Sequence, residues 1–236
     1  IQRSEVLREK INKYAWDGSW YIRATKDSGT PIGSSKCKEG KIFLNAQTWE
    51  IINGIAPEER ARKSMDSVER ILGTKYGPLL LHPAYSMPDE TIGYLTRYAP
   101  GVSENGGVYT HAAVWAILAE CIMKRQEKAW QFYLGIFPIY RGLDSKLYKA
   151  EPYVTPGNVD GPASANFGQA GWTWYTGSAA WMWKVGIEWI LGVRATFDGL
   201  IVDPCIPREW KRFKIERRFR GATYQIEVDN RKGVSY

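Results

Sequence analysis

The 236-residue chain is 44% hydrophobic and 14% aromatic, long enough to bury a sizeable core as one or two domains. Lysine and arginine (32) outnumber aspartate and glutamate (25), and the formal charge of +7 favours anionic ligands. The basic residues are scattered, and their only dense run, residues 211–220, alternates with apolar side chains as an exposed strand does, which argues against nucleic-acid binding. No apolar run of membrane-spanning length or signal peptide is visible.

The first third of the chain predicts helices separated by one long loop. Apolar residues recur at helical spacing over residues 6–14. Residues 17–40 are rich in Gly, Ser and Lys, which predicts a long loop. A helix pair is expected at residues 46–53 and 57–72, the second opened by Pro57.

The middle of the chain predicts a long irregular stretch and then more helices. Residues 73–108 contain several Pro or Gly turn clusters and little periodicity, and such long loops usually carry function. Helices are expected at residues 110–125 and 127–137, followed by a long one at 176–191 that Gly192 ends. Helices in sequential pairs separated by long loops indicate part of an α/α toroid.

The pattern changes to strands after residue 193. Residues 200–202, 213–220 and 223–228 alternate or run apolar in short segments with turn residues between them. The predicted fold is therefore mainly α, part of an α/α toroid, with a domain boundary near residue 193 and a small β-rich C-terminal domain.

Three cysteines, Cys37, Cys121 and Cys205, share no metal-ligand spacing with each other or with His82 and His111. An odd number of thiols indicates free cysteines in a reducing compartment, so we expect a cytoplasmic protein without a bound metal.

The most informative segment is GWTWYTGSAAW at residues 171–181. Its aromatic rings can stack on pyranose faces, and the free N–H groups at the start of the following helix favour an oxyanion such as phosphate. The alternative is that these tryptophans, with Trp183, form a core and that Thr176 is only an N-cap.

A second segment, PGVSENGGVYTH at residues 100–111, leads into an apolar helix. Gly106 and Gly107 allow a close backbone approach at the start of that helix. Glu104, Asn105 and His111 gather at the same end.

Together these two segments resemble glycoside hydrolase family 94. Further matching phrases are WDGSWYIRA at residues 16–24, NAQTW at 45–49, AEPY at 150–153, ILGVR at 190–194 and DGLIVDPCIP at 198–207. This family holds the inverting disaccharide and oligosaccharide phosphorylases, including cellobiose and chitobiose phosphorylases, and the phosphorylase-like region of cyclic β-1,2-glucan synthases.

The resemblance implies a much longer assembly: a β-sandwich, a helical linker, an (α/α)6 barrel and a C-terminal β-domain. Residues 1–192 correspond to the C-terminal part of the barrel and residues 193–236 to a β-rich C-terminal domain that is expected to be incomplete. The missing N-terminal part is an expected partner, and the complete enzyme is expected to be a homodimer.

The resemblance also implies the chemistry, which is inverting phosphorolysis of a β-linked glucoside to α-glucose 1-phosphate or its reverse. Phosphate replaces the water and base of an inverting hydrolase, so one carboxylic acid suffices. The family acid lies in an Asp-Trp-Asn-Asp motif upstream of this chain, so no catalytic residue is assigned here. No cofactor is implied, because inorganic phosphate is a substrate.

The family's binding residues map onto positions of this chain. The implied phosphate ligands are His111, Thr176 and Gly177. On the acceptor-sugar side the implied residues are Glu104, Tyr98 and Arg97, with Ser103 where cellobiose-specific members carry Lys, which argues against cellobiose as substrate.

Several alternatives remain open from the residues. His111 could be a structural histidine, and Glu104 an acid that stabilises a helix start. Other loop carboxylates, without a pairing pattern, are Asp17, Asp89, Glu90 and Asp160. The chain could be a non-catalytic carbohydrate-binding or structural fragment, or part of a hydrolase with the same toroid, which would need a second carboxylate facing the phosphate site.

Overall fold

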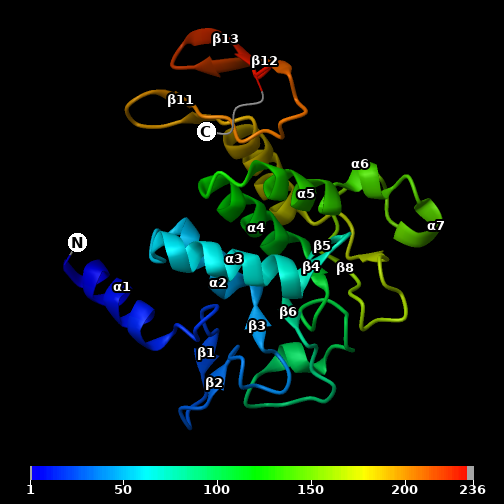
Figure 1. Ribbon diagram of the computed structural model, residues 1–236. Coiled ribbons are helices and arrows are strands. Elements are labelled where there is room, and N and C mark those ends of the chain that lie inside the picture. The colour runs from blue at the N-terminus through cyan, green and yellow to red at the C-terminus, as the bar shows by residue number, and fades with distance from the viewer. Residues whose placement is uncertain (1, 233–236) are drawn as a thin grey trace.

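The computed structural model describes residues 2–232 (Figure 1). Its longer helices are α1(Gln2–Tyr14), α2(Leu44–Ile52), α3(Glu58–Leu72), α4(Thr110–Ile122), α5(Gln126–Ile136) and α8(Thr176–Val185). Short helical turns are η1(Tyr94–Arg97), α6(Pro138–Arg141), α7(Ser145–Tyr148) and the π-helical η2(Gly186–Ile190).

The strands are short and form small antiparallel sheets. They are β1(Ala24–Thr25), β2(Pro31–Ile32), β3(Ile42–Phe43), β4(Gly73–Thr74), β5(Gly77–Pro78), β6(Leu81–His82), β7(Val108–Tyr109), β8(Asn158–Val159), β9(Ala170–Gly171), β10(Val193–Ala195), β11(Leu200–Val202), β12(Arg212–Phe219) and β13(Ala222–Asp229). Figure 1 shows the helices in the middle, the β12–β13 hairpin at one end and the loops with short strands at the other.

Helix α4 is the centre of the core and packs against α2, α5 and α8. Its small residues Ala112, Ala113, Ala116 and Ala119 are buried, and together they let neighbouring helices approach closely. A helix that is apolar on nearly every face needs such burial, so α4 is enclosed by the rest of the fold.

The predicted helices are confirmed, with differences at their ends. Helix α4 ends at Ile122 rather than near 125, because Lys124 adopts a left-handed φ of 58°. The predicted helix at 176–191 is α-helical only to Val185 and continues as a π-turn. The π-turn ends at Ile190. Gly192 follows, with a φ of 74°, and a Cβ there would lie 2.2 Å from the carbonyl carbon of Asp203.

The loop prediction for residues 17–40 was too simple, because β1 and β2 pair there as a small hairpin. The three predicted C-terminal strands are confirmed as β11, β12 and β13. Side chains along β12 alternate between exposed and half-buried, as the alternating sequence predicted.

The C-terminal strands are anchored to the helices. The rings of Trp130 and Trp210 meet edge-on with centroids 4.8 Å apart, and Lys124 pairs with Asp203. All three cysteines are free, as predicted, and Cys121 and Cys205 are buried. Within residues 2–232 no helix combines the length and apolarity needed to cross a membrane.

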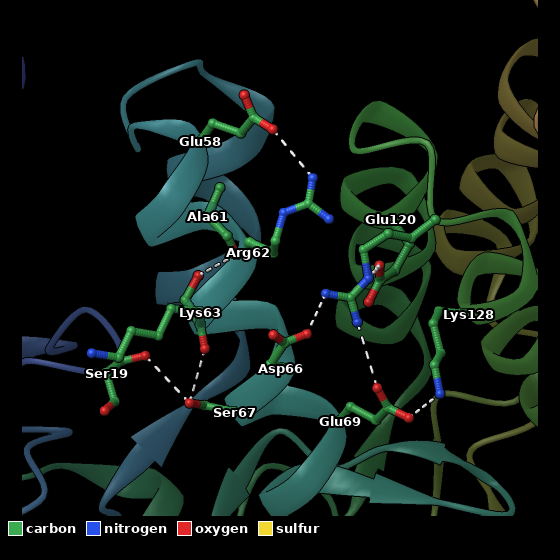
Figure 2. A network of polar contacts seen from close by, with 12 residues as sticks. Ser19, Glu58, Ala61, Arg62, Lys63, Asp66, Ser67, Glu69, Glu120 and Lys128 are labelled. Atoms are coloured by element: carbon green, nitrogen blue, oxygen red, sulfur yellow. Dashed lines mark hydrogen bonds and ion pairs between the residues drawn. The ribbon is translucent and has the colours of Figure 1, made fainter. Parts of the chain in front are cut away.

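A charged network joins α3 to the end of α4 (Figure 2). Glu120 is fully buried, and its Oε2 lies 2.8 Å from Nε of Arg125. Arg125 also contacts Asp66 at 2.5 Å and Glu69 at 3.5 Å, and Glu69 in turn binds Lys128. Burial outweighs the Arg125 charge and raises the pKa of Glu120 to about 8.

This pKa predicts a pH-dependent stability. A carboxyl whose pKa rises on folding stabilises the fold below its unfolded pKa and loses that stabilisation as the pH rises toward 8. The free energy of unfolding should fall between pH 5 and pH 9. We expect Glu120→Gln to make this fall smaller by at least about 1.4 kcal/mol, which is the free energy that corresponds to a shift of one pKa unit. Urea unfolding at both pH values measures this, and parallel pH profiles for the two proteins would contradict it.

Candidate functional site

A three-stranded sheet brings the two sequence segments of interest together. Strand β8 lies between β7 and β9, and Asn158 is paired with both Tyr109 and Gly171. Because β7 leads directly into α4, and β9 is followed closely by α8, the sheet places the N-terminal ends of these helices side by side.

Glycines make this close approach possible, as the sequence predicted. Gly106 adopts a φ of 85°, and a Cβ on Gly107 would lie 2.7 Å from the carbonyl oxygen of Ser103. A Cβ on Gly161 would lie 2.1 Å from the carbonyl oxygen of Gly106. The loops at 101–107 and 160–169 therefore touch through backbone atoms.

We expect Gly161→Ala to destabilise the fold by about 1–3 kcal/mol, because the added methyl group has to displace backbone rather than a flexible side chain. Urea denaturation measures the loss. Gly199→Ala is the matched control, because a Cβ there meets no atom within 4 Å. Equal stability of the two variants would contradict the close contact.

A small pocket of about 160 Å³ opens between the joined segments. It is lined by Tyr98, Ser103, Glu104, Tyr109, Gly157, Asn158, Trp172 and Tyr175. The predicted residues Glu104 and Tyr98 thus lie in one pocket with Trp172, which is 74% exposed and has a left-handed φ of 55°. Strained backbone of this kind is concentrated at functional sites.

Glu104 is held at the pocket wall. Its Oε2 accepts a hydrogen bond of 2.5 Å from Oγ of Ser103. The charge of Glu104 is the main cause that raises the pKa of Tyr98, so the carboxylate and the phenol lie near each other. Helix α4 begins at Thr110 without an acid in its first turn, so Glu104 lies outside that turn.

The predicted phosphate residues His111 and Gly177 face each other beside this pocket. A Cβ on Gly177 would lie 3.9 Å from Cε1 of His111. Nε2 of His111 is buried, and no residue in the described part of the chain hydrogen-bonds to it. Burial lowers the pKa of His111, so its imidazole is neutral near pH 7.

Thr176 is the exposed first residue of α8. The N-cap is Tyr175, whose side chain makes no capping bond, so the alternative of Thr176 as N-cap is wrong. The first-turn amides and the hydroxyl of Thr176 lie on the same helix end as Gly177. This end offers donors to an anion.

A phenol pair connects the pocket to the helix ends. The hydroxyls of Tyr109 and Tyr175 are 3.0 Å apart, and each tyrosine directly precedes its helix. Burial, together with the hydrogen bond to Tyr175, raises the pKa of Tyr109, so the Tyr109 phenol stays protonated at neutral pH.

Arg97 does not line the pocket. Its guanidinium pairs with Glu90 at 2.6 Å and lies over the ring of Tyr94. Its assignment to the acceptor site therefore stays a prediction from the resemblance.

The remaining loop carboxylates are each held within loop structure. Asp17 accepts bonds from Ser34 and Ser35, and Asp89 pairs with Lys26. Asp160 accepts a bond from Ser164. None of these three carboxylates lines the pocket.

The aromatic segment divides between packing and exposure. Trp181 lies 6.1 Å from the ring of His111 and from that of Trp115, so it supports the histidine. Trp172, Trp174 and Trp183 are all more than half exposed, which argues against a purely core role. Trp174 donates to Glu151 at 3.2 Å.

Sequence reasoning missed Asn158. It belongs to a two-residue strand in a stretch with no periodicity, and only the preceding Pro156-Gly157 turn marks the place. Among residues 2–232 no group of three or more His, Cys, Asp or Glu side chains is arranged to hold a metal.

A helical core whose aromatic pocket lies beside an anion-accepting helix end is the arrangement expected of a carbohydrate-active protein. The chain belongs to the glycosyl hydrolase 94 superfamily, because residues 1–192 match the family model described as its catalytic domain. Residues 193–236 match the model described as the glycosyl hydrolase family 65 C-terminal domain.

Curated relatives cover nearly all of this chain. It is 36% identical to solabiose phosphorylase of Paenibacillus borealis over 95% of the chain and 29% of that protein. It is 37% identical to N,N'-diacetylchitobiose phosphorylase of Vibrio proteolyticus over 97% of the chain and 29% of that protein. Identity to the cyclic beta-(1,2)-glucan synthase NdvB of Rhizobium meliloti (strain 1021) is 38%, over 97% of the chain and 8% of that protein. The chain thus spans less than a third of each of these relatives.

Proposed function

We propose that this chain is part of an inverting glycoside phosphorylase, in which it supplies the phosphate-binding helix ends and part of the sugar site. The reaction converts a β-linked gluco-disaccharide or oligosaccharide and phosphate to α-glucose 1-phosphate and a shortened sugar. The main supporting observation is that the His111 ring lies against Gly177 and that its Nε2 has no hydrogen-bond partner among residues 2–232. The nearby residues Tyr109 and Tyr175 line the pocket of Glu104 and Trp172.

The donors at this place suit a tetrahedral anion. A neutral imidazole N–H, a threonine hydroxyl and helix-end amides reach it from different distances without bringing a carboxylate that would repel it. Attack by phosphate needs no general base, since phosphate takes the place of the activated water in an inverting hydrolase. We propose that the general acid comes from the Asp-Trp-Asn-Asp region outside these 236 residues.

The same proposal extends to the architecture. Helices α2 to α5 and α8 would form part of the (α/α)6 barrel, and the complete enzyme would be a homodimer in the cytoplasm. The phosphorylases among the relatives carry names for different sugars, solabiose and N,N'-diacetylchitobiose among them. The family reaction therefore supports phosphorolysis in general, and the sugar has to be measured.

The second candidate is a carbohydrate-binding or structural fragment without turnover. The exposed Trp172 and Trp174 favour sugar binding by itself, and aromatic faces bind pyranoses without any acid.

The test uses a protein that contains this chain together with the acid-bearing region. Release of glucose 1-phosphate is measured with cellobiose, sophorose, laminaribiose and chitobiose, in the presence and absence of phosphate. Phosphate-dependent release supports the proposal, while glucose release without phosphate indicates a hydrolase. Sugar binding without turnover supports the second candidate. The 236-residue chain alone should be inactive, since loss of general-acid help costs about 10²–10⁴-fold.

A further inference from the structure

Asn158 carries a side-chain amide that has no hydrogen-bond partner among residues 2–232. It is 3% exposed, and its backbone is paired on both sides, with Tyr109 and with Gly171. Its side-chain amide makes no hydrogen bond within residues 2–232, although it belongs to the lining of the 160 Å³ pocket. Its side-chain oxygen and nitrogen are not sealed from solvent, so the unbonded amide opens into the pocket.

The sheet register explains why the amide stays open. Residues opposite each other in an antiparallel pair project to the same face, and opposite Asn158 stands Gly171, which has no side chain. A Cβ at Gly171 would lie 3.4 Å from Oδ1 and 3.6 Å from Nδ2 of Asn158. Glycine at 171 therefore leaves room above the amide, and the next residue, Trp172, lines the same pocket.

A second buried asparagine shows the contrast. The Asn105 amide accepts from the Tyr85 N–H at 2.8 Å and donates to the carbonyl oxygens of Tyr85 and Tyr98 at 2.9 and 2.8 Å. It joins two loops, and both its oxygen and its nitrogen are hydrogen-bonded. Asn158, by comparison, keeps both its acceptor and its donors available on the pocket side.

We propose that Asn158 is a specificity-determining residue that binds two neighbouring hydroxyls of the acceptor-side pyranose, one as donor and one as acceptor. Trp172 would cover the apolar face of that sugar, and Glu104 would accept from a further hydroxyl. This inference rests on the proposed function, because it places the acceptor-side sugar in this pocket.

The experiment is a double-mutant cycle in which variants of the protein are combined with analogues of the sugar. It uses the protein that contains the acid-bearing region. Reverse transfer from α-glucose 1-phosphate is measured with glucose and with each of its monodeoxy analogues, for the unchanged protein, Asn158→Ala and the isosteric Asn158→Asp. We expect Asn158→Ala to lower kcat/KM for glucose by about 10- to 100-fold, from the loss of one to two hydrogen bonds. The KM for α-glucose 1-phosphate should change less than about threefold.

The decisive result is the pattern over the analogues. The penalty of an analogue is its loss of kcat/KM relative to glucose. For the two hydroxyls that Asn158 binds, the penalty seen in the unchanged protein should disappear in Asn158→Ala, while the penalties at the other positions remain. Asn166→Ala, at an exposed position on the loop between β8 and β9, is the matched control and should retain every penalty. Asn158→Asp keeps the shape and one acceptor, so it should lose only the donor-dependent penalty.

Penalties that stay the same in Asn158→Ala and Asn158→Asp would overturn the inference while leaving the proposed function intact. If the unchanged protein transfers no glucosyl group, the proposed function fails instead. Calorimetric titration of the same proteins with glucose and its deoxy analogues then gives the same comparison, with Kd in place of kcat/KM. Coupling in those titrations supports the role of Asn158 in sugar binding, and its absence rejects it.

Discussion

Replacing His111 by alanine, or Thr176 by valine, should lower kcat/KM for phosphate by roughly 10- to 1000-fold, a loss of about 1.4–4 kcal/mol of transition-state binding. The reason is that the His111 ring lies at the start of α8, with Cε1 3.9 Å from the position of a Cβ on Gly177, and that Nε2 is buried without a hydrogen-bond partner among residues 2–232. The measurement is steady-state phosphorolysis in the protein that contains the acid-bearing region, with phosphate varied at saturating disaccharide.

Disaccharide binding in the absence of phosphate should change little in these variants. His82→Ala is the matched control, because His82 is exposed on β6 and does not line the pocket. If His111→Ala weakened both ligands equally, or only lowered the melting temperature with unchanged kinetics, His111 would be structural and the phosphate assignment would fail.

Glu104→Gln should give the opposite pattern, with acceptor-side sugar binding weakened by about 10- to 100-fold and phosphate affinity nearly unchanged. A hydrogen bond to a charged group is worth about 1.5–3 kcal/mol, and the amide that replaces the carboxylate keeps its size but loses its charge. The variant should also lower the pKa of Tyr98, since the Glu104 charge is the main cause of its rise.

Calorimetric titration with disaccharide and with phosphate separately measures both affinities, and ultraviolet titration of the phenol follows Tyr98 by difference against Tyr98→Phe. Glu58→Gln is the matched control, because Glu58 pairs with Arg62 on the surface of α3 and does not line the pocket. A loss of phosphate affinity in Glu104→Gln as large as the loss of sugar affinity would reject separate sugar and phosphate roles.

Local patterns were sufficient for most of the helices and for the C-terminal strands. Pro57 predicted the start of α3, and the alternation at 213–220 predicted β12. Such elements can be predicted locally, because residues close together in the sequence show which positions are buried. The helix end at Ile122 was missed because the left-handed backbone of Lys124 depends on the packing of the residues that follow the turn. Helix propensity does not report such packing.

The sequence by itself determined the family, through ordered phrases such as those at 100–111 and 171–181. It also led to the prediction that His111, Glu104 and the Thr176-Gly177 turn bind ligands. Only the tertiary structure decided which of these meet. It placed His111 opposite Gly177 and joined Glu104 to Trp172 in one pocket, while leaving Arg97 paired with Glu90. It also revealed Asn158, because the pairing of a two-residue strand with partners 49 and 13 residues away is a non-local contact, and no local pattern encodes it.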